Sequence, residues 1–134
     1  MSTDYDTIVD EIRTLHNDLA LWLGTAGATA ALDRFLTQQH PDFSMVTQTG
    51  MVVAREPLAA GLQGAGNSTP GLTIDILDIE ILHHSPDSTV ARFKEVHHHP
   101  SGPRARLTTA LLLADPEARN GLRWRTVHET AVAR

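Results

Sequence analysis

Histidine is the side chain of this sequence best suited to acid–base chemistry near neutral pH. The chain holds eight histidines and no cysteine, which excludes thiol nucleophiles and zinc–thiolate sites. His128 is the first candidate for a catalytic role, because an imidazole can donate, accept or transfer a proton. The structural alternative is a core histidine whose ring is satisfied by a neighbouring hydroxyl or carbonyl group.

The histidine run from His97 to His99 suggests a metal site at first sight. Successive side chains of a strand point to opposite faces, so only His97 and His99 can converge. His83 and His84 lie at the other end of the same predicted hairpin, roughly 23 Å away at ~3.3 Å per residue. We therefore expect no metal site and no cofactor, and we interpret the run as a solvated strand end.

Carboxylates are the other candidates for proton transfer. Asp42, in the string HPDF, can reach the mouth of a pocket as a general base, although it suits a turn equally well. The glycines of GLQGAGN lack the preceding strand and following helix that a phosphate-binding loop needs. No Gly-x-Ser-x-Gly or His-Glu-x-x-His string occurs in the sequence. His128 and Asp42 are therefore the two predicted catalytic residues.

The composition limits the partners of the chain. Its 134 residues suit a single domain, predicted over residues 1–134. A net charge of −5, with Lys94 as the single lysine, disfavours a nucleic-acid partner. No apolar stretch approaches the ~20 residues of a membrane helix, and no signal peptide is visible. We therefore expect a cytoplasmic protein with no membrane partner.

The N-terminal third of the sequence has the period of a helix. Residues spaced alternately four and three apart form one apolar stripe: Ile8, Ile12, Leu15, Leu19 and Trp22. Residues 2–4 can cap this helix, and Gly24 ends it. A second helix, with Phe35 inward, runs to about Gln38, and a third spans residues 56–62.

From residue 43 onward the period becomes two, which is the period of a strand. Residues 43–48 and 51–54 predict a short hairpin with glycine in its turn. Longer strand-like segments follow, separated by short turns: 72–84, 89–99, 104–114 and 122–130. Short links between strands predict an antiparallel meander, so the whole chain has an α+β pattern.

The order of these elements resembles the nuclear-transport-factor-2-like superfamily, in particular its SnoaL-like members. The string HPDFSMVTQTGMVVARE resembles their link from the second helix into the first hairpin, and DSTVARF resembles their turn into the central strand. LRWRTVHET resembles their last strand, an ending shared by the association domain of calcium/calmodulin-dependent kinase II. The resemblance implies a cystatin-like α+β fold: a cone-shaped, curved, antiparallel or mixed sheet wraps around about three N-terminal helices and leaves a cavity. Relatives include isomerases, polyketide cyclases, dehydratases, epoxide hydrolases and non-catalytic modules, so the resemblance does not give the function.

The hairpin turns predict which residues face each other across the sheet. The turn between the first two long strands places His83 opposite Val90 and His97 opposite Ile76. Carried through the later hairpins, this register gives two faces. One is rich in aliphatic residues and includes Trp124, whereas the other mixes aliphatic residues with both signs of charge.

We predict that the face with Trp124 lines the cavity, because the face packed on helices should be the more apolar one. Residues of this face, together with helix and loop residues, are the predicted ligand-binding set: Trp22, Phe35, Phe43, His98, Thr109, Leu111, Trp124, Thr126 and His128. Arg92 and Lys94 are further polar residues of this face. The other face, with Arg125 and Glu129, suits the convex interface of a homodimer.

Three functions follow from these observations. The first is a homodimeric module that binds a small, largely apolar molecule between helices and sheet. The second is an isomerase, cyclase or dehydratase with His128 or Asp42 as general base. The third is a dimerisation or assembly domain. We favour the first, because no catalytic acid of the steroid isomerases or polyketide cyclases can be matched residue by residue to this chain.

Overall fold

The structure, a computed structural model, describes residues 5–132. Its helices are α1 (Tyr5–Gly24), α2 (Thr29–Thr37), α3 (Arg55–Gln63) and the 3-10 helix η1 (Arg119–Gly121). Its strands are β1 (Gln39–Val46), β2 (Val52–Ala54), β3 (Thr73–His84), β4 (Ser88–His99), β5 (Gly102–Ala114) and β6 (Leu122–Ala131). The helix cap expected within residues 2–4 lies outside the described residues. None of the described helices is long and apolar enough to cross a membrane.

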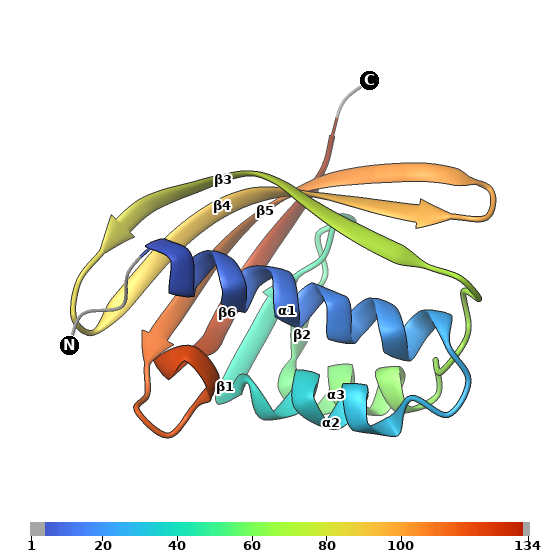
Figure 1. Ribbon diagram of the computed structural model, residues 1–134, viewed down its shortest axis with the longest axis horizontal. Coiled ribbons are helices and arrows are strands. Elements are labelled where there is room, and N and C mark those ends of the chain that lie inside the picture. The colour runs from blue at the N-terminus through green and yellow to red at the C-terminus, as the bar shows by residue number, and fades with distance from the viewer. Residues whose placement is uncertain (1–4, 133–134) are drawn as a thin grey trace.

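The strands form one curved, mixed sheet with the helices on its concave side (Figure 1). The strand order is β2-β1-β6-β5-β4-β3. Strands β3 to β6 form the predicted antiparallel meander, whereas β1 runs parallel to β6 and antiparallel to β2. The predicted α+β fold, a curved sheet wrapped around three helices, is therefore confirmed.

Strand β1 begins earlier than the sequence predicts. It starts at Gln39, ahead of Pro41, whereas the predicted hairpin begins at Phe43. Gln39 pairs with Trp124 on β6, and the pairing then breaks until Ser44. Pro41 falls within this break because proline has no N–H to give to a ladder.

Strand β3 carries two irregularities that the sequence does not predict. The register shifts twice along β3, so that His97 pairs with Ile74 and not with Ile76. At one shift Asp78 adopts a φ of 56°, in the left-handed region that aspartate tolerates better than most residues. Each extra residue turns the following side chains to the other face of the sheet.

A bulge in β6 reverses the predicted assignment of the two faces. Trp124 and Thr126 lie opposite neighbouring residues of β5, so Arg125 is an extra residue in the strand. Trp124 therefore shares a face with Val127 and Glu129 instead of with Thr126. The prediction that Thr126 and His128 line the cavity was wrong. It assumed that side chains alternate between the faces without interruption from Trp124 onward, and the bulge at Arg125 breaks that alternation.

The concave face of the sheet and the apolar stripe of α1 make the core. The sheet contributes buried residues from four strands: Ile74, Ile76, Ala91, Phe93, Ala110, Leu112 and Trp124. Ile8, Ile12 and Leu15 of α1 pack with them, as the helical stripe predicts. Removing this apolar surface from water is the main force that holds the helix in the sheet.

Buried charges tie the chain before β6 to α1. The fully buried carboxylate of Glu11 accepts hydrogen bonds from Arg119 Nε (3.0 Å) and Nη2 (3.2 Å). It also accepts one from the indole Nε1 of Trp124 at 2.9 Å. Arg119 Nη1 donates to Asp18 Oδ2 at 3.1 Å. We call this set of four residues the α1 clamp.

We expect Arg119→Met to lower the free energy of unfolding by about 3–5 kcal/mol, because it leaves Glu11 buried without its cationic partner. Arg92→Met is the matched control, since Arg92 pairs with Glu80 on the exposed face of the sheet. Exposed pairs contribute about 0–1 kcal/mol. Urea denaturation of both variants measures the difference. Equal losses in the two variants would show that the clamp contributes no more than a surface pair.

Candidate functional site

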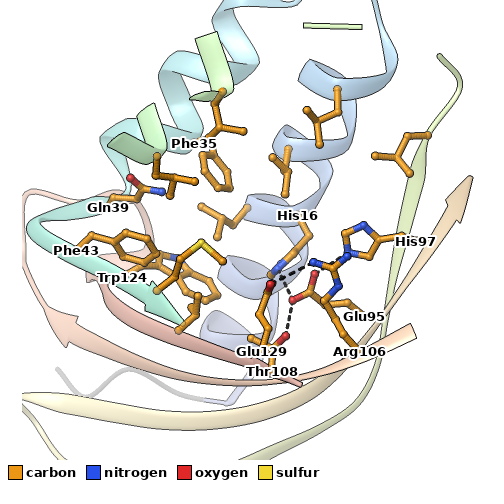
Figure 2. Close-up of a pocket in the computed structure, with 18 of the residues that line it drawn as sticks. His16, Phe35, Gln39, Phe43, Glu95, His97, Arg106, Thr108, Trp124 and Glu129 are labelled. Carbon is orange, nitrogen blue, oxygen red and sulfur yellow. Dashed lines mark hydrogen bonds and ion pairs between the residues drawn. The ribbon is translucent and has the colours of Figure 1, made fainter. Parts of the chain in front are cut away.

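A cavity of about 280 Å³ lies between the helices and the concave face of the sheet (Figure 2). That is roughly twice the ~150 Å³ of a cavity known to hold benzene, so a small organic molecule fits. Most of its wall is apolar: Leu15, Leu19, Leu23, Phe35, Phe43, Met45, Leu58, Leu62, Leu72, Trp124 and Val127. The curvature of the sheet and the placement of three helices therefore leave an apolar chamber inside the fold.

One side of this cavity is polar. Side chains from α1 and three neighbouring strands line it: His16, Glu95, His97, His99, Arg106, Thr108 and Glu129. Figure 2 shows five of them gathered around Glu95, away from Phe35 and Gln39: His16, His97, Arg106, Thr108 and Glu129. Strand alternation brings Glu95, His97 and His99 to one face of β4, and the adjacent β5 and β6 supply the others.

Glu95 is buried and ionised. Thr108 Oγ1 donates to its Oε2 at 2.6 Å, and His97 Nε2 donates to its Oε1 at 2.8 Å. His16 Nε2 lies 3.4 Å from the same Oε2. Burial disfavours the carboxylate, but the charge of His16 and these hydrogen bonds outweigh burial and hold the pKa of Glu95 well below its usual range.

His16 is the cation that balances Glu95. Its Nδ1 lies 2.7 Å from the carbonyl oxygen of Ile12, which can only accept, and its Nε2 faces the carboxylate. An imidazolium, which carries hydrogen on both ring nitrogens, is the form that satisfies both contacts. Burial opposes this state, but the charge and hydrogen bonds of Glu95 and Ile12 raise the pKa of His16. The rings of Phe93 and Trp124 pack edge-on against it, with centroids at 5.3 and 5.9 Å.

Glu129 is a second carboxylate at the cavity, in a different electrostatic state. Arg106 Nη1 donates to its Oε1 at 3.2 Å. Burial and the negative charge of Glu95 raise the pKa of Glu129, although Arg106 opposes the shift. Carboxylates whose pKa values move in opposite directions suit different roles. Glu95 is a fixed anion, whereas Glu129 is suited to exchange a proton with a bound molecule.

The structure brings three of the predicted ligand-binding residues to the cavity: Phe35, Phe43 and Trp124. The predicted strand residues lie on the convex face instead, because of the β6 bulge: His98, Thr109, Leu111, Thr126 and His128. Arg92 and Lys94 lie on that face too. His98 there pairs with Asp75 at 2.9 Å, and His128 is exposed.

Trp22 and Asp42 also lie outside the cavity. The indole of Trp22 donates to the carbonyl of Leu62 at 2.7 Å and packs against Gly66, where a Cβ would come within 2.9 Å of the ring. Trp22 therefore fixes the loop that follows α3. Asp42 lies within β1 with an exposed side chain, and its backbone N–H donates to His40 Nδ1 at 3.0 Å. It is therefore a strand residue and does not form the turn that the sequence also allowed.

The histidine run divides between the two faces as strand alternation predicts. His97 and His99 stack with ring centroids 6.2 Å apart on the concave side, and His98 points outward. Nε2 of His97 is engaged by Glu95, a partner that the sequence did not indicate. Within residues 5–132 no group of three or more His, Asp and Glu side chains is arranged to hold a metal ion.

The charged pair predicts a dependence of stability on pH. The folded protein holds the His16 proton more tightly than the unfolded chain, whose ordinary pKa is 6.5. This stabilisation is fully present below pH 6.5 and is lost as the pH rises through the raised pKa. The Glu95 contribution is present above its ordinary value of 4.5 and is lost as the pH falls through the lowered pKa.

We therefore expect the stability difference between the wild type and His16→Gln to be largest between these two values and to shrink at higher pH. Urea denaturation from about pH 5 to about pH 9 measures it. His128→Gln, an exposed histidine on the convex face, controls for loss of an imidazole elsewhere. A His16→Gln difference that is constant with pH would contradict the charged pair.

Solved structures with the same architecture were found by comparison. An NTF-2-like protein of unknown function from Pseudomonas aeruginosa is 31% identical, with a TM-score of 0.87 over 95% of this chain and 99% of that one. The CaMKII hub of S. rosetta (11% identity, TM-score 0.72, covering 95% of each chain) shares the fold. So does ActVI-ORFA from Streptomyces coelicolor (13% identity, TM-score 0.65, covering 95% and 96%). No protein-family model and no curated protein sequence matches the chain. From the first of these similarities, the chain belongs to the NTF-2-like family.

Proposed function

We propose that the cavity binds a small, largely apolar molecule that carries polar groups. The observation that carries this proposal is an apolar chamber of about 280 Å³ with one polar side. Binding sites for small molecules combine apolar walls with a few convergent polar groups in this way. Burial of the ligand's apolar surface would supply affinity, and the polar side would set its orientation.

The ion pair of Glu95 and His16 supports this proposal. Burying two charges costs free energy, and an apolar pair of similar size often stabilises a protein as well or better. The pair does, however, fix the polar side of the cavity before any ligand arrives, because Glu95 also accepts from His97 and Thr108. Preorganised groups lower the entropy lost on binding.

Acid–base chemistry on the bound molecule is the enzymatic form of this proposal. Glu129 takes the place of His128 and Asp42 as the group suited to it, because it lines the cavity and its pKa is raised by burial and by Glu95. The cytoplasmic location and the single-domain organisation stay predictions from the sequence.

We expect Leu19→Trp to lower the affinity for naphthalene by about tenfold or more, which corresponds to ~1.4 kcal/mol, because the larger ring fills the cavity. Equilibrium dialysis measures the affinity. The matched control is Leu21→Trp, which adds the same ring to the exposed face of α1. Circular dichroism checks that both variants are folded, since overpacking costs about 1–3 kcal/mol. Unchanged binding by folded Leu19→Trp would place the ligand elsewhere.

Self-association through the convex face is a second candidate function. Leu77 and Leu107 are 45% and 44% exposed, and they flank Lys94 in one row across β3, β4 and β5. Glu129, which was expected on this face, lies on the concave side instead. Exposed apolar patches of this kind favour protein contacts. The likeness in fold to a CaMKII hub agrees with an assembly role.

We expect the wild type to be a dimer at concentrations on the order of 100 μM and Leu107→Glu to be a monomer, because the variant replaces an exposed leucine of the interface by a carboxylate that would have to lose its water on association. Sedimentation velocity distinguishes the two. Leu21→Glu, on α1, is the control and should leave the dimer intact. A monomeric wild type would remove this candidate and leave the cavity proposal standing.

A further inference from the structure

Gln39 is a buried amide with no protein partner. Its side chain is 3% exposed and lines the cavity at the start of β1. Among the described residues 5–132, neither its Oε1 nor its Nε2 has a hydrogen-bonding partner. Buried polar groups are nearly always hydrogen-bonded in native proteins, because an unpaired one loses its water without compensation. An unpaired amide at a cavity wall therefore points to a partner that the cavity receives.

The preceding residue shows what a structural glutamine looks like in the same place. Gln38 is also 3% exposed. Its Nε2 donates to the carbonyls of Arg119 (3.2 Å) and Leu122 (3.1 Å), and its Oε1 accepts from the backbone N–H of Arg119 at 3.2 Å. Gln38 thus holds the segment before β6 in place through hydrogen bonds. The carboxamide of Gln39, in contrast, makes no hydrogen bond within the described chain.

Gln39 lies at the apolar side of the cavity. Figure 2 shows it beside Phe35, on the opposite side of the chamber from Arg106 and Glu129. It pairs with Trp124, and the cavity residue Glu129 lies further along β6. Allowing for the bulge, the backbones at the two ends are roughly 13 Å apart at ~3.3 Å per residue. The hydrogen-bonding groups of the two sides therefore lie at opposite ends of the chamber.

The polar side also holds an unpaired donor. Arg106 uses Nη1 to bind Glu129, but its Nε is buried and has no partner in the described chain. A hydroxyl or carbonyl oxygen of a ligand can accept from this N–H. At the other end the carboxamide of Gln39 offers one donor group and one acceptor group side by side. The matching chemical group is one that is itself both donor and acceptor.

We infer that the molecule bound in this cavity has an apolar body whose end facing Gln39 carries an uncharged group that both donates and accepts hydrogen bonds, such as a hydroxyl, a carboxamide or an un-ionised carboxylic acid. The inference rests on the proposed function and specifies the class of ligand. An ionised group is disfavoured at this end, because Phe35 and Phe43 surround it and Gln39 has no charge to balance it. Gln39 also borders a polar surface hollow with Arg55 and Arg123, so an anionic probe belongs in the test.

The test compares three probes with one ring system: naphthalene, 2-naphthamide and 2-naphthoate. The wild type should bind 2-naphthamide about tenfold or more tighter than naphthalene, because a site built to hydrogen-bond a group rejects the analogue that lacks it. Gln39→Met, which keeps the length of the side chain but removes the amide, should erase this gap between the two affinities. Equilibrium dialysis at pH 7.5 gives all three affinities.

Gln38→Met is the matched control and separates recognition from folding. It removes satisfied hydrogen bonds, so its midpoint of thermal unfolding should fall while the preference for 2-naphthamide persists. Gln39→Met removes an unpaired amide, so its midpoint should stay the same or rise. Opposite shifts in these neighbouring variants would exclude a general loss of stability as the cause of altered binding.

Each other outcome overturns a different statement. If Gln39→Met keeps the tenfold preference for 2-naphthamide, Gln39 does not hydrogen-bond the ligand. The inference then fails, while the cavity proposal stands. If 2-naphthoate is the probe that depends on Gln39, the bound class is anionic and the inference fails in that respect. If none of the three probes binds the wild type, the proposed function fails and takes the inference with it.

Discussion

A charge buried in a protein needs a partner, and α1 carries three such residues beside the apolar stripe that enters the core. Glu11 is held by Arg119 and Trp124, His16 by Glu95, and Asp18 by Arg34 and Arg119. Apolar packing alone tolerates small sliding movements, whereas these directional contacts fix the helix at one position and rotation. The helix is thus held in front of β4 and β6 at a set distance, and a cavity persists beside it.

The fold could be predicted from the sequence because its signals are local. The stripe of α1 depends on spacings of three and four residues, and the turn at 85–88 sits between two clear strands, so that His83 pairs with Val90 as predicted. Bulges are different. Nothing in the letters around Arg125 marks it as an extra residue, and one such residue exchanges the inner and outer faces of everything that follows.

The polar side of the cavity was missed for a related reason. His16 lies four residues after Ile12, so it interrupts the apolar stripe of α1 with a titratable group, and this signal was available in the sequence. Its partner Glu95 lies in a distant strand, and only the true register shows that it points inward. Gln39 could not be distinguished from Gln38 by sequence at all, because the two differ only in whether a partner lies within reach.

The parallel pairing of β1 with β6 has a consequence for the order in which the molecule forms. Strand β6 lies between β1 and β5, so within residues 5–132 the β1–β2 hairpin joins the rest of the sheet through β6, the most C-terminal of the described strands. During synthesis, residues 122–131 follow Phe43 and Met45 by about 80 residues, so Trp124 and Val127 complete the wall beside them only late. Contacts between such distant segments form slowly, because closing a long loop costs entropy before the contact is made. The wall of the chamber is therefore incomplete until β6 is synthesised, and a nascent chain that lacks β6 exposes this apolar lining to solvent and to other chains.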